Sequence, residues 1–235
     1  MPDKRLPSII VFDVNETLLD LTTLEPLFER VFGEAAVMRE WFAQLILYSE
    51  ALTLSEIYTH FGEIASGTLR MVGETSGHAV SDDDVAELKQ RIGTMPAHPD
   101  VAPALDRLRA AGFRLVTLTN SPPGQSPTSL ERAGLADYFE RSFSVAEVGY
   151  FKPAPQTYRL VAEELGVELP DLCMVACHLW DTIGAQAAGC SGAFVKRPGN
   201  AAIFADCVPV PDIVVDDMHE LAEKIIGKWS EYRHS

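Results

Sequence analysis

The hydrophobic positions of the chain first form a short continuous run, from Ile9 to Phe12, which ends abruptly at Asp13 and a polar turn. A short apolar run bounded by a turn is typical of a strand buried in a parallel sheet. Open α/β sheets bind their ligands at the carboxyl ends of such strands. The pattern therefore predicts a buried first strand that carries Asp13 into a ligand site, although an aspartate that only caps a strand would show the same local pattern.

A long stretch from about residue 24 to residue 93 has apolar residues at helical spacing and no convincing strand. It predicts four helices, which cover residues 25–32, residues 38–54, a segment through Ile57, Phe61, Ile64 and Leu69, and residues 85–92. The second of these helices places four apolar residues on one face: Trp41, Leu45, Tyr48 and Leu52. This part of the chain is therefore expected to be all helical.

From Val101 onward, helices and strands are expected to alternate. Five further strands are predicted, at residues 113–118, 142–145, 173–175, 193–195 and 213–215. Strands that alternate with helices imply a parallel, doubly wound sheet with right-handed crossovers. The chain is thus expected to be an α/β protein with a helical cap inserted after the first strand. Residues 1–20 and 97–235 would form the core domain, and residues 21–96 the cap domain.

The formal net charge of −15 restricts the classes of partner. Nucleic acids and anionic membranes attract basic surfaces, so this chain is expected to bind neither. No apolar run approaches the roughly 20 residues of a transmembrane helix, and little chain precedes the first strand to serve as a signal peptide. We therefore expect a cytoplasmic protein. The helical segment carries more apolar positions than one buried face needs, which suggests a homodimer through the cap.

Three later segments place polar side chains where strands end or turns follow. Thr119 and Asn120 end one strand, Lys152 lies between turn residues, and Asp181 follows another strand. Each of them alone has an ordinary structural explanation, because hydroxyl and carboxylate groups cap helices and a loop lysine is normally solvated. A doubly wound sheet would nevertheless gather all of them beside Asp13. Their order along the chain therefore predicts one shared site.

This ordered set resembles the four motifs of the haloacid dehalogenase (HAD) superfamily over nearly the whole chain. Within that superfamily, the chain is most similar to the type II 2-haloacid dehalogenases. Those enzymes share a short helical cap, a tyrosine shortly after a Lys-Pro pair (Tyr158 here) and a Trp-Asp pair (Trp180 and Asp181 here). The resemblance implies a Rossmann-like core and a hydrolase.

The resemblance also implies catalytic roles for Asp13, Lys152 and Asp181. Asp13 would attack the α-carbon of a small 2-substituted carboxylic acid and form an ester, which water would hydrolyse to a 2-hydroxy acid. Lys152 would keep Asp13 ionised, and Asp181 would position Lys152 or the water. The expected substrate-binding residues are Asn15, Thr17, Phe42, Thr119, Asn120, Tyr158, His178 and Trp180.

No metal and no cofactor is expected. HAD phosphatases carry a second aspartate two positions after the nucleophile and another acid four positions before the last aspartate, but this chain has Asn15 and Cys177 there. The proton donor for a phosphate ester is thus missing, and too few hard oxygen ligands remain to favour Mg²⁺. The four cysteines contain no CxxC pair and no histidine at zinc spacing.

The cap departs from the dehalogenase pattern at one position that matters for the leaving group. The arginine that receives the departing halide usually follows a tryptophan, but here Phe42 follows Trp41. Arg39 lies two residues before Trp41, which is about 200° round the helix axis. Arg39 would therefore replace the missing cation only if the cap helix were rotated.

The region of the nucleophile and the fourth motif also differ from that pattern. The dehalogenases usually carry an aromatic residue and a glycine where this chain has Asn15 and Glu16, and a serine and an asparagine where it has Ala176 and His178. In the ordinary explanation, Glu16 is a solvated turn residue and His178 is a loop histidine bonded to the backbone. Both residues are also candidates for chemistry.

Four functions therefore stay open. We favour a 2-haloacid dehalogenase that releases a halide ion. An enzyme that opens the strained ring of azetidine-2-carboxylate would need a proton or a carboxylate partner, which Glu16 or His178 could supply. A HAD phosphatase and a non-enzymatic protein that associates through its cap are the remaining alternatives.

Overall fold

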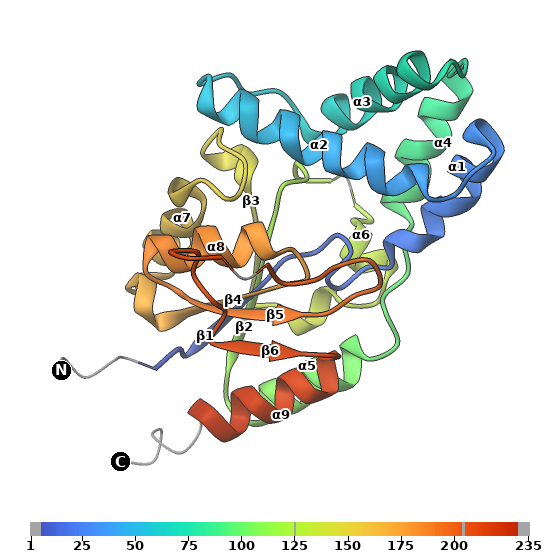
Figure 1. Cartoon of the computed structure of the whole chain (residues 1–235). Helices are drawn as coiled ribbons and strands as arrows, with labels where there is room; N and C mark the ends of the chain where they lie inside the picture. The colour runs from blue at the N-terminus through green and yellow to red at the C-terminus, as the bar shows by residue number, and fades with distance from the viewer. Residues whose placement is uncertain (1–5, 125, 204, 230–235) are drawn as a thin grey trace.

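The computed structural model describes residues 6–124, 126–203 and 205–229, and Figure 1 draws the whole chain. At its centre is a six-stranded sheet with the strand order β3-β2-β1-β4-β5-β6, in which each pair of neighbours is parallel. The strands are β1 (Ile9–Phe12), β2 (Arg114–Thr119), β3 (Arg141–Ser144), β4 (Leu172–Ala176), β5 (Ser191–Val195) and β6 (Ile213–Val215). The expected doubly wound α/β sheet is confirmed.

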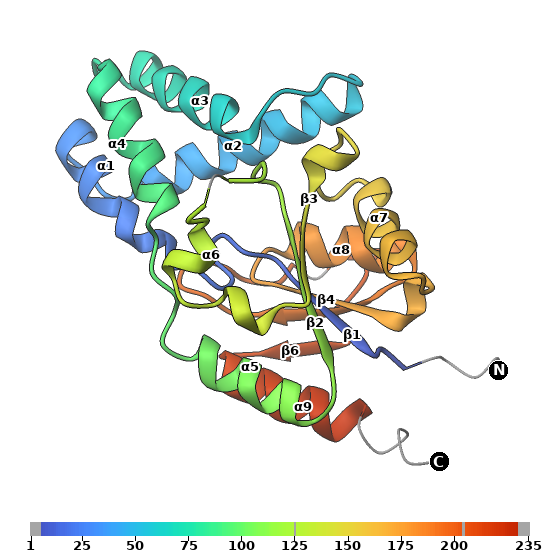
Figure 2. The ribbon, with the colours of Figure 1, turned by 180° about the vertical axis from the view of Figure 1, so that it is seen from behind.

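Helices cover both faces of this sheet. Figures 1 and 2 show α5 and α9 together on one side and α7 and α8 on the other. The helices that accompany the later strands are α5 (Val101–Ala110), α6 (Ser129–Arg132), α7 (Pro155–Leu165), α8 (Leu179–Ala188) and α9 (Met218–Trp229), with short 3₁₀ turns η2 (Ala136–Tyr138), η3 (Val145–Glu147) and η4 (Leu169–Asp171). Because both faces are covered, β1, β4 and β5 are buried at every position, and this explains their continuous apolar sequences.

The part of the chain between β1 and α5 is helical and stands apart from the sheet, at the top of Figure 1. It consists of the 3₁₀ turn η1 (Leu21–Leu24) and the helices α1 (Glu25–Phe32), α2 (Val37–Leu54), α3 (Phe61–Ser76) and α4 (Asp82–Gly93). The helix α4 starts at a capping box, in which the side chains of Ser81 and Asp84 each accept the backbone N–H of the other residue. A helical insertion therefore follows the first strand, while the division into two domains at residues 20 and 97 remains a prediction.

Two details of the cap helices differ from the sequence pattern. Ile57 is 54% exposed and lies between α2 and α3, since α3 begins only at Phe61. Tyr48 is 42% exposed, although its neighbours Leu45 and Ser49 on α2 are buried. Figure 1 shows that α3 lies along the first part of α2 and leaves its end uncovered. Helical spacing alone cannot reveal where the neighbouring helix stops.

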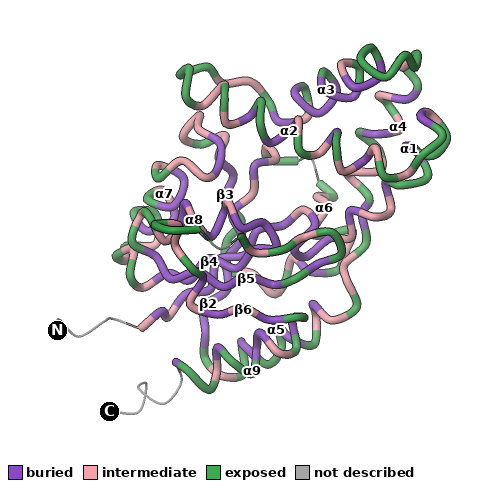
Figure 3. Tube along the Cα trace, in the orientation of Figure 1, coloured by how far each residue is buried: buried purple, intermediate pink, exposed green. Residues whose placement is uncertain are grey.

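The uncovered end of α2 and the loop that follows it carry a group of exposed apolar side chains. They are Leu47, Tyr48, Leu54 and Ile57; Figure 3 shows how exposed and buried residues are distributed along the trace. A homodimer through the cap stays a prediction.

Among the helices of the described residues, none has the length and apolar character that a membrane span requires.

Candidate active site

Asp13 lies at the carboxyl end of β1, a strand with neighbours on both sides. Phe12 is in register with Thr117 of β2 and Val175 of β4, and the Asp13 N–H donates to the Val175 carbonyl over 3.0 Å. Only 5% of Asp13 is exposed. A buried carboxylate must be paired with cations or hydrogen-bond donors, so the surroundings of Asp13 decide what it does.

Lys152 pairs with Asp13 from the segment that follows β3. Its ammonium donates to Asp13 Oδ1 (2.9 Å), to Asp181 Oδ2 (2.6 Å) and to the Leu118 carbonyl (3.0 Å). An ammonium group has three protons, so these contacts use all of them. The residue is buried, and its backbone N–H donates to Asn120 Oδ1 over 3.0 Å. Lys152 is therefore no solvated loop lysine, and Asn120 holds its segment in place.

Asp181 lies in the first turn of α8, which begins at Leu179. Its Oδ1 accepts the Tyr158 hydroxyl over 2.7 Å, and its Oδ2 accepts Lys152. Both Asp181 and Tyr158 are fully buried. Tyr158 thus contacts the acid and positions it, and a contact of this tyrosine with substrate stays a prediction.

Gly184 permits this arrangement, although the sequence analysis did not single it out. A Cβ at this position would lie 2.4 Å from Pro153 Cβ and 2.9 Å from the Tyr158 hydroxyl. Only glycine therefore lets α8 pack against the turn that follows Lys152. A glycine inside an otherwise good helix pattern is the signal that could have pointed to such a close approach.

Thr17 holds the other oxygen of Asp13. Its hydroxyl donates to Asp13 Oδ2 (2.7 Å) and accepts the Cys177 N–H (3.0 Å), and the residue is fully buried. The Thr17 carbonyl in turn accepts Arg197 Nε (3.2 Å) and Nη2 (3.0 Å), while Arg197 also pairs with Asp100. Arg197 was not a candidate residue, but its place directly after β5, at a strand's carboxyl end, is a usable signal.

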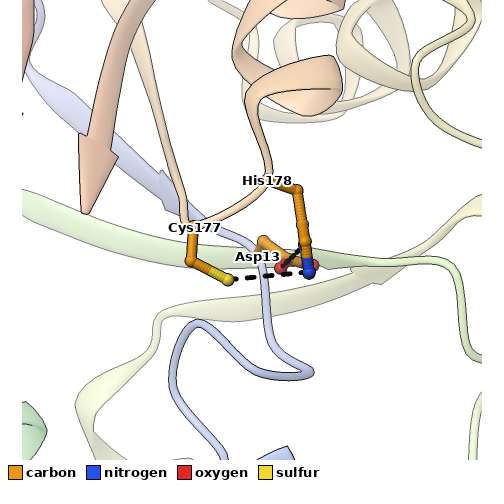
Figure 4. A group of neighbouring side chains, drawn as sticks. All are labelled: Asp13, Cys177 and His178. Atoms are coloured by element: carbon orange, nitrogen blue, oxygen red, sulfur yellow. Dashed lines mark hydrogen bonds and ion pairs between the residues drawn. The ribbon is translucent and has the colours of Figure 1, made fainter. Parts of the chain in front are cut away.

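His178 also lies beside Asp13 Oδ2. Its Nδ1 is 3.2 Å from that oxygen and its Nε2 is 2.7 Å from Glu16 Oε2. Figure 4 shows the side chains of Asp13, Cys177 and His178 pointing toward one another. Glu16 is 2% exposed and His178 is 5% exposed. The ordinary explanations are therefore wrong: Glu16 is not a solvated turn residue, and the ring of His178 contacts carboxylates.

Glu16 reaches its partners from an uncommon backbone conformation. Its φ of 66° is in the left-handed region, which costs a residue other than glycine about 1–2 kcal/mol. His98 Nε2 lies 3.0 Å from the Glu16 carbonyl and helps to hold the turn. A buried charge at a strained position is typical of a functional site.

Arg39 of α2 reaches this turn without any rotation of the cap helix. Its Nη1 forms a salt bridge with Glu16 Oε1, and its Nη2 donates to the Pro198 carbonyl over 2.6 Å. The expectation that Arg39 would replace the missing cation only in a rotated helix stays a prediction, since this contact is with Glu16. The Arg39 guanidinium is held by Glu16, so Arg39 does not replace a free halide-binding arginine.

Six ionisable groups thus follow one another with alternating sign across the site. In order they are Arg39, Glu16, His178, Asp13, Lys152 and Asp181. Apart from Arg39, which is partly exposed, these side chains are almost completely buried. Burial of charge is tolerated when each group has a partner of opposite sign, and this row provides one for every member.

The row also sets the protonation states. Burial alone would raise the pKa of Asp13, but the Lys152 ammonium and His178 outweigh it and hold that pKa below its usual value. Burial would lower the pKa of Lys152, which the carboxylates of Asp13 and Asp181 raise. Burial would also lower the pKa of His178, yet the Cys177 sulfur and the hydrogen bonds to Asp13 and Glu16 raise it well above its usual value. At neutral pH the Asp13 carboxylate is ionised and the imidazole is protonated.

Two aromatic rings enclose the imidazole. The His178 ring stacks on Trp180 (centroids 5.1 Å apart, 11° between planes) and on Phe42 of the cap (5.2 Å, 28°). The Lys152 ammonium lies 5.8 Å from the centre of the Trp180 ring. Position 42 therefore faces the site, as the sequence analysis assumed.

Asn15, Thr119 and Ser121 line the side of the site that opens toward solvent. Asn15 Nδ2 donates to Ser121 Oγ (3.2 Å), and the Ser121 N–H donates to Thr119 Oγ1 (3.1 Å). Two adjoining hollows of about 360 and 320 Å³ share Asn15 and Ser121, and the second also reaches Phe61 of the cap. Asn15, which lines both hollows, is only two positions after Asp13 in the chain.

Three potential metal donors also meet at the site. The ligand atoms of Asp13, Cys177 and His178 all lie within 4.8 Å of one another. Burial raises the pKa of the Cys177 thiol, the imidazole is protonated, and the Lys152 ammonium lies 2.9 Å from Asp13. The Lys152 ammonium that already pairs with Asp13 would repel a divalent metal ion bound there. Metal independence nevertheless remains a prediction.

Comparison with known proteins agrees with this geometry. Residues 7–189 match the family model described as haloacid dehalogenase-like hydrolase. The chain is similar to the (S)-2-haloacid dehalogenase H-109 of Pseudomonas putida, with 26% identity over 220 residues that cover 92% of this chain and 97% of that protein. It is also similar to the (S)-2-haloacid dehalogenase of Xanthobacter autotrophicus, with 29% identity over 202 residues that cover 85% of this chain and 79% of that protein.

Among solved structures, the chain resembles the L-2-haloacid dehalogenase from Xanthobacter autotrophicus with chloropropionic acid covalently bound. The TM-score is 0.84 at 25% identity, and the match covers 94% of this chain and 99% of that one. The resemblance inferred from the order of the sequence motifs is thus confirmed.

Proposed function

The chain belongs to the haloacid dehalogenase-like hydrolases, and on that premise we propose that it hydrolyses a small 2-haloacid through an ester on Asp13. The products would be a halide ion and a 2-hydroxy acid. The observation that carries the proposal is the buried, ionised Asp13 carboxylate held between Lys152 and His178. Relatives named (S)-2-haloacid dehalogenase support the choice of substrate. The ring-opening alternative has no support among these relatives.

In the first step, Asp13 attacks the α-carbon from the side opposite the halogen. The carbon–oxygen bond forms as the carbon–halogen bond breaks, and the halide leaves with the electron pair. A carboxylate is a weak nucleophile in water, so a site that excludes water favours the attack. Lys152 and His178 keep Asp13 ionised although it is buried.

In the second step, water attacks the carbonyl carbon of the ester and releases the 2-hydroxy acid. The Lys152 ammonium and the Thr17 hydroxyl each donate to one oxygen of Asp13. Donors in these places stabilise the negative charge that develops on the carbonyl oxygen. Tyr158 and Asp181 would act by keeping Lys152 in position.

The substrate carboxylate would bind on the open side of the site, near Asn15 and Thr119. Both residues line the larger of the two hollows, together with Val14, the residue that follows Asp13 in the chain. Phe42 and Trp180 would supply apolar contact for the carbon chain of a small acid. Their rings already enclose the imidazole beside the nucleophile.

A phosphatase is not favoured by this geometry. Asn15 occupies the position of the proton donor, and its amide donates to Ser121. The amide oxygen of Asn120 already accepts the backbone N–H of Lys152. Cys177 offers only a buried thiol, whose pKa burial raises. Such a donor set does not favour Mg²⁺.

We also propose that the enzyme acts in the cytoplasm. Its cysteines Cys173, Cys177, Cys190 and Cys207 are free thiols. Free thiols are the usual state of cysteine in a reducing compartment. Cell fractionation with an antibody against the protein tests this location.

The test of the proposed function measures halide release from (S)-2-chloropropionate. The wild type should release chloride with and without EDTA, whereas Asp13→Asn should release none. Asp137→Asn, at an exposed position, serves as the matched control and should behave like the wild type. A single turnover in heavy-oxygen water should leave the label in the Asp13 carboxylate, because water attacks the ester carbonyl.

Two results would contradict the proposal. One is a wild type that releases no halide from any 2-haloacid but hydrolyses p-nitrophenyl phosphate in the presence of Mg²⁺. The other is heavy oxygen found only in the product, which would mean that water attacks the α-carbon directly.

A further inference from the structure

His178 is the imidazole in the row of charges, and histidine is the most frequent general base of enzymes. The imidazole bridges two carboxylates that come from the same turn after β1. Nδ1 lies 3.2 Å from Asp13 Oδ2 and Nε2 lies 2.7 Å from Glu16 Oε2. A nucleophile within reach of a base, and a base oriented by a third group, is the arrangement that defines a catalytic triad.

We propose that Asp13, His178 and Glu16 form a nucleophile–base–carboxylate triad, in which His178 accepts a proton from the water that hydrolyses the Asp13 ester. The inference rests on the proposed function, since it requires an ester intermediate. As a base, His178 acts in the second step only; before the ester forms, its charge only adds to that of Lys152, which keeps Asp13 ionised in its absence. Formation of the ester needs no base, because Asp13 attacks in its ionised form.

The geometry places His178 Nδ1 where such a base is needed. A water that attacks the Asp13 carbonyl carbon must approach to about 3 Å of the carboxyl group. Because Nδ1 lies 3.2 Å from Asp13 Oδ2, the same water comes within hydrogen-bond reach of the ring. Phe42 and Trp180 fix the plane of the ring by stacking on its two sides.

The other candidates for the base are placed less well. Asp181 is fully buried and contacts Lys152 (2.6 Å) and Tyr158 (2.7 Å), and it is Lys152 that lies against Asp13. The Lys152 ammonium donates to three acceptors and carries no lone pair. His178 is the group beside Asp13 that can present a free lone pair once it loses a proton.

Ester formation itself prepares the base. In the free enzyme, the carboxylates of Asp13 and Glu16 hold the proton on the imidazole. When Asp13 becomes a neutral ester, one of these two charges disappears, and His178 releases its Nδ1 proton to solvent. The neutral ring keeps the proton on Nε2, which still donates to Glu16, and the lone pair of Nδ1 faces the ester.

The proton transfers of the second step balance. The oxygen of water bonds to the carbonyl carbon while one of its protons passes to His178. The bond between that carbon and the alkoxide oxygen breaks, and the alkoxide takes the proton from His178 and leaves as the 2-hydroxy acid. The resulting Asp13 carboxylic acid returns a proton to His178. One water is consumed, and the single proton lost to solvent accompanies the halide.

Glu16 is a positioning residue in this scheme. Its Oε2 accepts from His178 Nε2, and its Oε1 is paired with Arg39, so the carboxylate cannot turn away. It selects the ring orientation in which Nδ1 faces Asp13 and stabilises the imidazolium that forms when water is deprotonated. A carboxylate does the same for the histidine of a serine protease triad.

The experiment follows the ester by intact-protein mass spectrometry during turnover of (S)-2-chloropropionate. His178→Gln should release one equivalent of chloride per active site in a burst and then accumulate protein that carries the propionate substituent on Asp13. Steady-state turnover should fall about 10²–10⁴-fold, the usual contribution of a general base. Added imidazole should speed loss of the adduct in His178→Ala. The exposed His219→Gln is the matched control and should show no adduct.

Glu16→Gln tests the positioning role. It should lower the rate of adduct hydrolysis more than the rate of the chloride burst and shift the pH dependence of that hydrolysis. A purely structural role would instead affect both steps together. Thermal unfolding of each variant shows whether the protein is folded under the assay conditions.

Three outcomes would overturn the triad. His178→Gln could hydrolyse its adduct at the wild-type rate, or Asp181→Asn could accumulate the adduct while His178→Gln does not. A folded His178→Gln that gives no chloride burst would also overturn it, since His178 would then act before the ester forms. If the wild type itself releases no halide, the proposed function fails first and the triad falls with it.

Discussion

Replacing Lys152 with methionine keeps most of the side-chain volume but removes the ammonium that joins Asp13 to Asp181. The two carboxylates would then face each other in a site that admits almost no solvent. Loss of one partner from a buried ion pair costs about 3–5 kcal/mol. In a domain of this size, each kcal/mol shifts the melting temperature by about 2–4 °C, so we expect a fall of about 6–20 °C. Turnover should fall by at least about 10²-fold, because the variant also loses a donor to the developing oxyanion.

Lys89→Met is the matched control for this substitution. Lys89 pairs with Glu63 at 2.9 Å, the same distance as Lys152 to Asp13, but the two side chains are 48% and 63% exposed. Exposed pairs contribute about 0–1 kcal/mol, so the melting temperature should barely change. The measurement is calorimetry of both variants beside the wild type. Equal shifts for the two variants would refute the argument that burial gives the Lys152 pair its importance.

Three further predictions concern the ring of His178 and the packing of α8. Phe42→Arg should lower the rate of chloride release at least about tenfold, because the new guanidinium would face the protonated His178. A higher rate would contradict this and would show that the wild-type site lacks a cation to stabilise the departing halide. Gly184→Ala should lower the melting temperature, because the new Cβ would lie 2.4 Å from Pro153 Cβ. Its control is Gly67→Ala in α3, where a Cβ meets open space, and this change should raise the free energy of unfolding by about 0.5–1 kcal/mol. The third prediction concerns pH: the folded-state pKa of His178 is raised, so its stabilising contribution is complete below the unfolded pKa of about 6.5 and is lost as pH rises through the folded value. The difference in urea midpoint between the wild type and His178→Gln should therefore shrink as pH rises above about 6.5, and a constant difference would contradict the raised pKa.

The elements and the meeting point of the motifs could be predicted because each rests on a local rule. The apolar run that ends at Asp13 identifies a buried strand, and parallel strands bring their carboxyl ends to one edge. The positions of Thr119, Lys152 and Asp181 therefore followed from the order of the strands. What these residues touch did not follow, and Asn120 and Tyr158 prove to hold Lys152 and Asp181 in place.

The row of charges was beyond sequence reasoning for a physical reason. Arg39 and Glu16 are 23 residues apart, and nothing near Glu16 in the sequence indicates that a cap helix covers its turn. A glutamate in a polar turn is solvated in most proteins, so the ordinary reading is the better guess until tertiary contacts are known. The prediction that Ile57 belongs to the third helix was wrong for a similar reason. Helical spacing cannot show that α2 ends at Leu54 and that α3 begins only at Phe61.

The alternating row of charges also restricts how this protein can change over generations. Glycine at position 16 would leave the protonated His178 with one carboxylate and Arg39 without its partner, and asparagine at position 178 would leave Glu16 with Arg39 alone. Each single step toward the pattern of similar dehalogenases thus passes through an intermediate that carries a poorly compensated buried charge. We therefore expect the effects of substitutions at positions 16, 39 and 178 to be strongly non-additive, because the three side chains belong to one network of charges.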